Sequence, residues 1–178
     1  MSEKLSFVDT HAHVQMAEFD ADREDVLERC WGSGVSWIVC PGVDLITSDL
    51  AGQLGEREPR VLAAFGVHPE DCADAPSDYL ERLRALFARY GERAVAVGEI
   101  GLDFKEGTPD HALQLRFFEE QLQLAADLGL PVIVHSRFAV AECLSAISHF
   151  AALRGVMHCF GGTPAEVERA AGMGLCVS

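Results

Sequence analysis

The sequence lacks any apolar run long enough to cross a bilayer, and its first residues lack the apolar segment of a signal peptide. The six cysteines include no Cys-x-x-Cys pair, and most of them lie within apolar segments. These absences predict a cytoplasmic protein with free, buried thiols. They give no indication of a membrane partner or of an obligate protein partner.

Basic residues are also scarce, since 14 Lys and Arg stand against 28 Asp and Glu and leave a net charge of −14. This balance argues against broad electrostatic capture of nucleic acid, which requires a basic surface. It does not exclude a phosphodiester substrate, because bound cations would make a pocket locally positive. The hydrophobic content of 49% and the length of 178 residues are typical of one α/β domain with a real core.

A glycine-rich phosphate loop is missing after the first expected strand, which weakens a dinucleotide-binding interpretation. Short Val- and Ile-rich runs alternate with amphipathic segments, and this alternation predicts parallel strands joined by helices. We expect strands near residues 5–11, 36–43, 61–67, 94–99, 130–135, 155–158 and 174–178. We expect helices near residues 20–31, 47–54, 77–90, 108–128, 140–147 and from 163 onward.

This pattern predicts a (β/α)8 TIM-type barrel, incomplete here because the sequence accounts for about seven strands. The whole chain, residues 1–178, would form one domain that lacks the last barrel units. A doubly wound open sheet is the alternative that the pattern leaves open.

Several expected strands lead directly into metal-ligand residues. The side chains are those of His11, His13, Glu99, His135 and His158. Because the carboxyl ends of parallel strands meet at one edge of the sheet, we expect these groups to converge. His11 and His13, two residues apart, could reach one ion, while His135 and His158 would serve a second. Glu99 could bridge the two cations, and we assign the catalytic roles to Glu99, His135 and His158.

Other polar residues near the strand ends are candidates for substrate contact. His68 could touch a phosphate or be a turn histidine, and Arg137 could bind phosphate or form a rim salt bridge. Asp103 could bind substrate or fix its loop, and Asp9 could orient an imidazole or form a buried hydrogen bond. We interpret His111 and His149 as solvated and Cys159 as buried filler facing away from His158.

Five motifs, in order, resemble those of the TatD-type metal-dependent deoxyribonucleases, a family of amidohydrolase-like barrels. They are the segments at residues 9–13 (DTHAH), 66–69 (GVHP), 97–103 (VGEIGLD), 130–137 (LPVIVHSR) and 158–162 (HCFGG). Gln114, Phe118, Gln121, Leu122 and Ala125 also resemble the family pattern. The resemblance covers essentially the whole chain, and the combination of motifs makes it specific.

The resemblance implies two divalent ions, one bound by His11 and His13, the other by His135 and His158, with Glu99 as the bridge. It also implies hydrolysis of DNA phosphodiesters by a metal-activated water, commonly as an exonuclease. The ion could be Zn²⁺, Mn²⁺ or Mg²⁺, because several imidazoles favour the first two and availability favours the third.

Two departures from the family pattern stand out. Phe138 occupies the position after His-Ser-Arg where the family often has Asp, and this change would alter the pocket wall. The family's last metal-ligand Asp, on the eighth strand, has no counterpart before Ser178. We expect a fragment of a longer enzyme, with a degraded gene product or two chains that pair at open edges as alternatives.

Three functions therefore remain open at this point. The first is a DNase. The second is a metal-dependent esterase or deacylase, for example on aminoacyl-tRNA, because the ligand set does not distinguish phosphorus from carbonyl centres. The third is an inactive metal-binding fragment.

Overall fold

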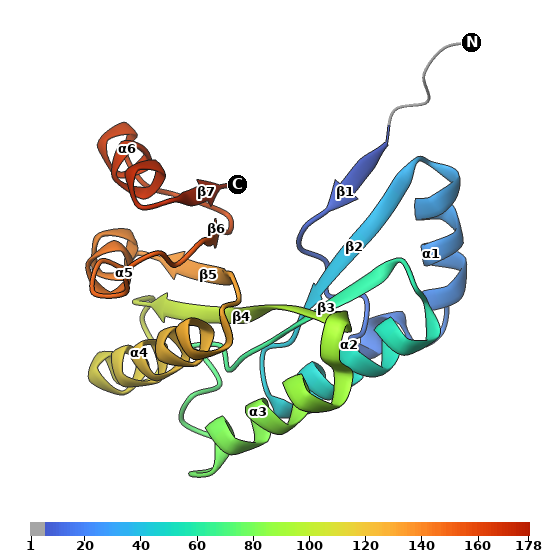
Figure 1. Cartoon of the computed structure of the whole chain (residues 1–178), viewed down its shortest axis with the longest axis horizontal. Helices are drawn as coiled ribbons and strands as arrows, with labels where there is room; N and C mark the ends of the chain where they lie inside the picture. The colour runs from blue at the N-terminus through green and yellow to red at the C-terminus, as the bar shows by residue number, and fades with distance from the viewer. Residues whose placement is uncertain (1–5) are drawn as a thin grey trace.

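A computed structural model describes residues 6–178, in which seven parallel strands form one curled sheet covered by helices on its outer face (Figure 1). Each strand pairs with its neighbour in the chain, so the strand order is the sequence order. In a doubly wound sheet the strand order changes direction partway across the sheet. This sheet shows no such change, so that alternative is excluded. The half-barrel confirms the predicted α/β barrel class, and β1 and β7 face each other across its open side.

All seven expected strands are present, with shifted ends. They are β1 (Phe7–Asp9), β2 (Val35–Pro41), β3 (Val61–Phe65), β4 (Ala94–Asp103), β5 (Val132–Arg137), β6 (Gly155–Met157) and β7 (Leu175–Val177). The first predicted strand was too long, because it ends at Asp9, and Leu5 lies outside the described residues. The fourth was too short, because β4 continues past Glu99 to Asp103.

The expected helices are also present. The helical segments are η1 (Ala17–Phe19), α1 (Arg23–Gly32), α2 (Leu45–Arg57), α3 (Tyr79–Tyr90), η2 (Gly91–Arg93), α4 (His111–Leu128), α5 (Val140–Ile147) and α6 (Pro164–Gly172). A capping box of Thr163 and Glu166 begins α6, where a helix was expected from residue 163 onward. α4 begins later than the expected residue 108, since Asp110 caps it by accepting from the backbone N–H groups of Ala112 and Leu113.

Alternation along the strands divides the sheet into two faces. Ala64, Ala96 and Ile133 form a small inner cluster, while most other buried apolar side chains pack between the sheet and the helices. Residues two apart in a strand share a face. His135 therefore continues the inner face beyond Ile133, at the carboxyl end of β5.

Gly101 allows β4 and β5 to approach closely beside the strand ends. Its φ is +145°, and a Cβ atom there would lie 2.0 Å from the carbonyl oxygen of His135. No larger residue fits that space without moving a strand. Glycine at this position therefore lets the carboxyl end of β4 run directly beside His135.

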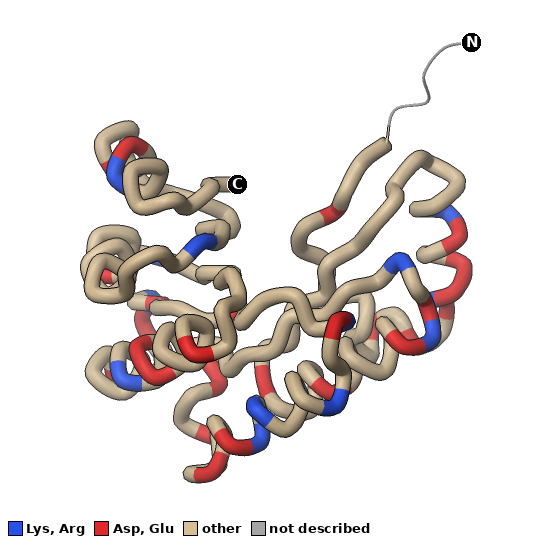
Figure 2. The backbone as a smooth tube through the Cα atoms, in the orientation of Figure 1, with Lys and Arg blue, Asp and Glu red and all other residues tan. Residues whose placement is uncertain are grey.

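Charge is distributed unequally between the helices and the sheet (Figure 2). Most Asp and Glu residues lie on the helices and loops, and the strands are almost free of charge. The charged residues of the described strands are Asp9, Glu99, Asp103 and Arg137. Within residues 6–178, no helix combines the length and apolar character needed to cross a membrane.

Candidate metal centre

The carboxyl ends of the strands bring imidazoles and carboxylates together on the inner side of the curled sheet. The residues that contribute are His11 and His13 after β1, His68 after β3, Glu99 and Asp103 in β4, His135 in β5 and His158 after β6. The convergence expected from the strand-end pattern is therefore present, although the segments are far apart in the sequence.

Glu99 lies between two groups of imidazoles and is only 4% exposed. Its Oε2 atom lies 3.2 Å from Nε2 of His11 and 3.5 Å from Nε2 of His13. Its Oε1 atom lies 3.3 Å from Nδ1 of His135. Each oxygen thus faces a different set of nitrogens, which is the arrangement that a bridging carboxylate requires.

The first donor group consists of His11, His13 and Glu99. Nε2 of His11 and Nε2 of His13 are 3.1 Å apart, and both residues lie in the loop after β1, because that strand ends before the predicted residue 11. A tetrahedral ion with bonds of about 2.0–2.1 Å separates its ligand atoms by about 3.3 Å, close to these spacings. Nδ1 of His13 lies 2.9 Å from the carbonyl oxygen of Pro41, and this contact leaves its Nε2 free to ligate.

The second donor group consists of His68, Glu99 and His135. The rings of His68 and His135 are T-shaped, with centroids 4.4 Å apart. Nε2 of His135 lies 2.9 Å from a carboxylate oxygen of Asp103, which is 1% exposed and orients the ring. His68, predicted to contact substrate, therefore lies among possible metal donors.

His158 occupies a different place from the one expected. Its ring stacks on that of His11, with centroids 3.5 Å apart and planes 8° from parallel. It lies against the first donor group, and neither three-residue donor group of the described chain includes it. A ligand role for His158 stays a prediction. In the stacked ring of His11, Nδ1 is buried and has no hydrogen-bond partner among residues 6–178.

The charges of the cluster are coupled through Glu99. Burial alone would raise the pKa of Glu99, but hydrogen bonds from His11, His13 and His135 hold that pKa far below its ordinary value. The hydrogen bond to Glu99 raises the pKa of His13. Burial lowers the pKa of His135, but its hydrogen bonds to Glu99 and Asp103 outweigh burial and leave that pKa raised. The carboxylate is therefore ionised and available to a cation.

Two further imidazoles of the cluster, those of His68 and His158, favour the neutral form. Burial, followed by the neighbouring His135, lowers the pKa of His68 to about 4. Burial, followed by the nearby His11, lowers the pKa of His158. A neutral imidazole has a lone pair to offer, so the donor chemistry of the cluster fits a divalent ion.

Two buried glutamines of α4, Gln114 and Gln121, hold the backbone on either side of the second donor group. Gln121 accepts from the N–H of Val67 at 2.7 Å and donates to the C=O of Val67 at 3.0 Å. Gln114 accepts from the N–H of Asp103 and donates to its C=O, both at 2.8 Å. These amides satisfy backbone groups next to His68 and at Asp103 itself. The sequence showed that both glutamines resemble the family pattern, but it did not show these backbone contacts.

Replacement of Gln121 by Leu is expected to lower the free energy of unfolding by about 2 kcal/mol, because it leaves the buried N–H and C=O groups of Val67 unpaired. Chemical denaturation measures this change. Gln123→Leu, on the exposed side of the same helix, is the matched control and should change stability by less than about 0.5 kcal/mol. Equal losses in the two variants would contradict the proposed role of the Gln121 amide.

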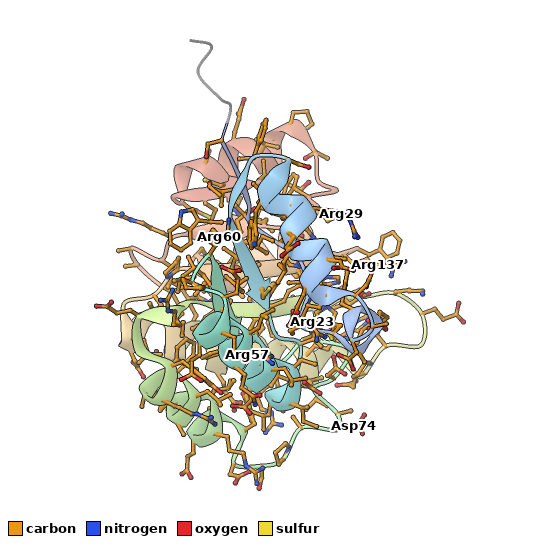
Figure 3. All side chains as sticks on the ribbon, turned by 90° about the vertical axis from the view of Figure 1, so that its right-hand side faces the viewer. Arg23, Arg29, Arg57, Arg60, Asp74 and Arg137 are labelled. Carbon is orange, nitrogen blue, oxygen red and sulfur yellow. The ribbon has the colours of Figure 1, made fainter. Side chains whose placement is uncertain are left out.

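Arg23, which sequence reasoning missed, fixes the loop that follows His13. It begins α1 (Figure 3) and donates to the carbonyl oxygens of Val14, Gln15 and Met16 at 2.7, 3.2 and 2.9 Å. Three neighbouring carbonyls on one guanidinium make this loop a defined structure despite its lack of regular pairing. No side-chain pattern could reveal this role, because the partners are backbone atoms.

A cleft of about 710 Å³ opens beside the cluster, between the segments that follow β5 and β6. His135 and His158 line it together with Arg137, Phe138 and Cys159. The prediction that Cys159 is buried was wrong, because its φ of +49° breaks the strand alternation and leaves the residue exposed. All six cysteines, which lie within residues 6–178, are free, and three of them are buried.

The remaining predicted residues lie outside the two donor groups. Arg137 is exposed at the periphery of the molecule (Figure 3), and no ion pair joins it to a carboxylate within residues 6–178. Asp9 accepts from the backbone N–H of His11 at 3.1 Å. His149 is exposed as expected, whereas the exposed His111 stacks on Phe104 with ring centroids 3.9 Å apart.

Comparisons with known proteins agree with this geometry. The sequence model of the TatD-related DNases matches residues 8–178. The chain is 36% identical over 163 residues to the uncharacterized metal-dependent hydrolase YabD of Bacillus subtilis, covering 90% of this chain and 63% of that protein. It is 36% identical over 169 residues to the 3'-5' ssDNA/RNA exonuclease TatD of Cronobacter sakazakii, covering 94% and 64%.

Among solved structures, the chain is similar to the TatD homologue YJJV of Escherichia coli, with a TM-score of 0.91 and 32% identity. That match covers 96% of this chain and 66% of the other. The chain thus spans a little under two thirds of the length of these relatives.

Proposed function

Because this chain belongs to the family of TatD-related DNases, we propose that its histidine–glutamate cluster binds two divalent cations and hydrolyses phosphodiester bonds of DNA. The observation that carries the proposal is Glu99, whose two carboxylate oxygens face separate groups of imidazoles. A purely structural glutamate would need only one such set of partners. When bound, two cations would lower the pKa of a water molecule and stabilise negative charge on the phosphate oxygens.

Each residue of the cluster has a place in this proposal. His11 and His13 hold the first ion, His135 holds the second, and Glu99 bridges them. His158 completes the second set if its ring turns from His11, and His68 is a further donor or a phosphate contact. Asp103 fixes the orientation of His135, and Arg137 meets a phosphate of the substrate from the rim of the cleft.

Nucleic acid as the substrate is supported by the family and by one relative, a 3'-5' ssDNA/RNA exonuclease. The proposal is tested by incubating the protein with Mn²⁺, Zn²⁺ or Mg²⁺ and single-stranded DNA, RNA, a small phosphodiester or an acyl ester, with chelator as the control. Metal-dependent cleavage of DNA is expected. Cleavage of the ester alone would replace the proposal with an esterase, and metal uptake without turnover would leave only a metal-binding protein.

A further inference from the structure

Phe138 is the most exposed large apolar side chain of the described residues, at 76% of its surface. It directly follows the last residue of β5 and has a φ of +54°, in the left-handed region that bulky residues rarely adopt. The ring is not buried in the core, and its backbone conformation is unfavourable for a bulky residue. A gain in stability therefore does not explain a phenylalanine at this position. Residues held in this way are concentrated at functional sites.

The position of Phe138 connects it to the metal centre. It lines the same cleft as His135 and His158, three residues beyond the donor His135 in the chain. The guanidinium carbon of its neighbour Arg137 lies 5.8 Å from the centre of the phenyl ring. A flat apolar face therefore lies beside a cation that has no ion pair within residues 6–178, on the rim of the cleft and next to the proposed hydrolytic site.

A nucleotide carries the complementary pair of groups, a flat base and an anionic phosphate. Phenylalanine has no hydrogen-bonding group, so it can stack on a base without reading its identity. In a duplex both faces of an internal base are covered by neighbouring bases, and only an unpaired or terminal base presents a free face. The chemistry of this rim therefore selects for an unpaired nucleotide.

We propose that Phe138 is a stacking platform for one unpaired base of a nucleic-acid strand whose phosphate meets Arg137. This inference rests on the proposed function, because it names the substrate class of the same site. It predicts a preference for single strands and frayed ends over closed duplexes, with little discrimination among bases. The residue would determine specificity and would not take part in bond cleavage.

Phe138→Ala and Phe138→Gly test the proposal. Glycine suits the left-handed backbone, so the second variant removes the ring without added strain. Both are expected to lower kcat/KM for single-stranded oligothymidylate by roughly tenfold. Hydrolysis of an abasic strand of the same length, which has the phosphates but no bases, should be unchanged within about twofold. Phe138→Trp should restore the loss, because tryptophan also stacks.

Leu128→Ala is the matched control. Leu128 is an exposed apolar residue shortly before the amino end of β5, whereas Phe138 follows the carboxyl end of that strand. It should leave both substrates unaffected. If Phe138→Ala slows the abasic strand as much as oligothymidylate, or slows neither, the stacking platform is refuted while the nuclease function stands.

A binding measurement separates the inference from the proposed function. The probe is a single strand with 2-aminopurine at its end, whose fluorescence falls on stacking, titrated with wild type or Phe138→Ala in the presence of chelator. Quenching by the wild type and its loss in the variant would support the platform even if no nucleic acid were hydrolysed. Equal quenching by both proteins would overturn it.

Discussion

Glu99→Gln is expected to abolish the binding of both cations and to lower phosphodiester hydrolysis by about a thousandfold or more. The substitution keeps the size of the side chain but removes its charge and replaces one oxygen with an NH₂ group that cannot ligate a cation. Because Oε1 and Oε2 face different imidazole groups, the loss affects both donor sets. Metal content after dialysis, measured by mass spectrometry, and the hydrolysis rate check the prediction.

The matched control is Glu119→Gln, an exposed glutamate on α4 whose change removes the same charge from the molecule. It should leave metal content and rate unaffected. A Glu99→Gln protein that is folded and retains two ions per chain would show that Glu99 does not bridge them, whatever happens to the rate.

His135→Ala should reduce the metal content from two ions per chain to one and lower hydrolysis by at least about a hundredfold. His135 is the residue that faces both Glu99 and Asp103, at 3.3 and 2.9 Å. Its removal takes a ligand from the second donor group and leaves His11 and His13 in place. Stoichiometry by metal analysis separates this outcome from a general loss of structure.

His149→Ala, on an exposed segment after α5, is the control for the removal of an imidazole. Free imidazole added to the His135→Ala protein should restore part of the activity if the loss comes from the missing ligand. Two ions retained together with full activity would rule out His135 as a ligand of the second ion.

The fold was largely predictable because each buried strand is a short apolar run and glycine follows several helices. The errors concern the residues at which individual helices and strands begin or end. At α4, Thr108 and Asp110 are both good capping residues, and the hydroxyl of Thr108 instead donates to the carbonyl oxygens of Asp103 and Lys105. The extension of β4 to Asp103 depends on the close approach at Gly101, which no periodicity indicates.

The convergence of the candidate metal donors was predictable, because these residues follow strands whose carboxyl ends lie on the same side of the sheet. The contacts of the surrounding residues were not predictable. Gln114, Gln121 and Arg23 act on backbone atoms, so no pairing of side-chain types reveals them. Phe138 and Cys159 depart from alternation because their φ angles are positive, and a sequence does not show the sign of φ at such residues.

The two glutamines of α4 have a consequence for the motions of the protein. The backbone N–H groups of Val67 and Asp103 both donate to glutamine side chains of α4, although Val67 lies in the loop after β3 and Asp103 ends β4. A local opening that lifts α4 from the sheet would release both at once. Their hydrogen exchange with solvent should thus be slow and share one opening free energy, and the second donor group would loosen as a single unit.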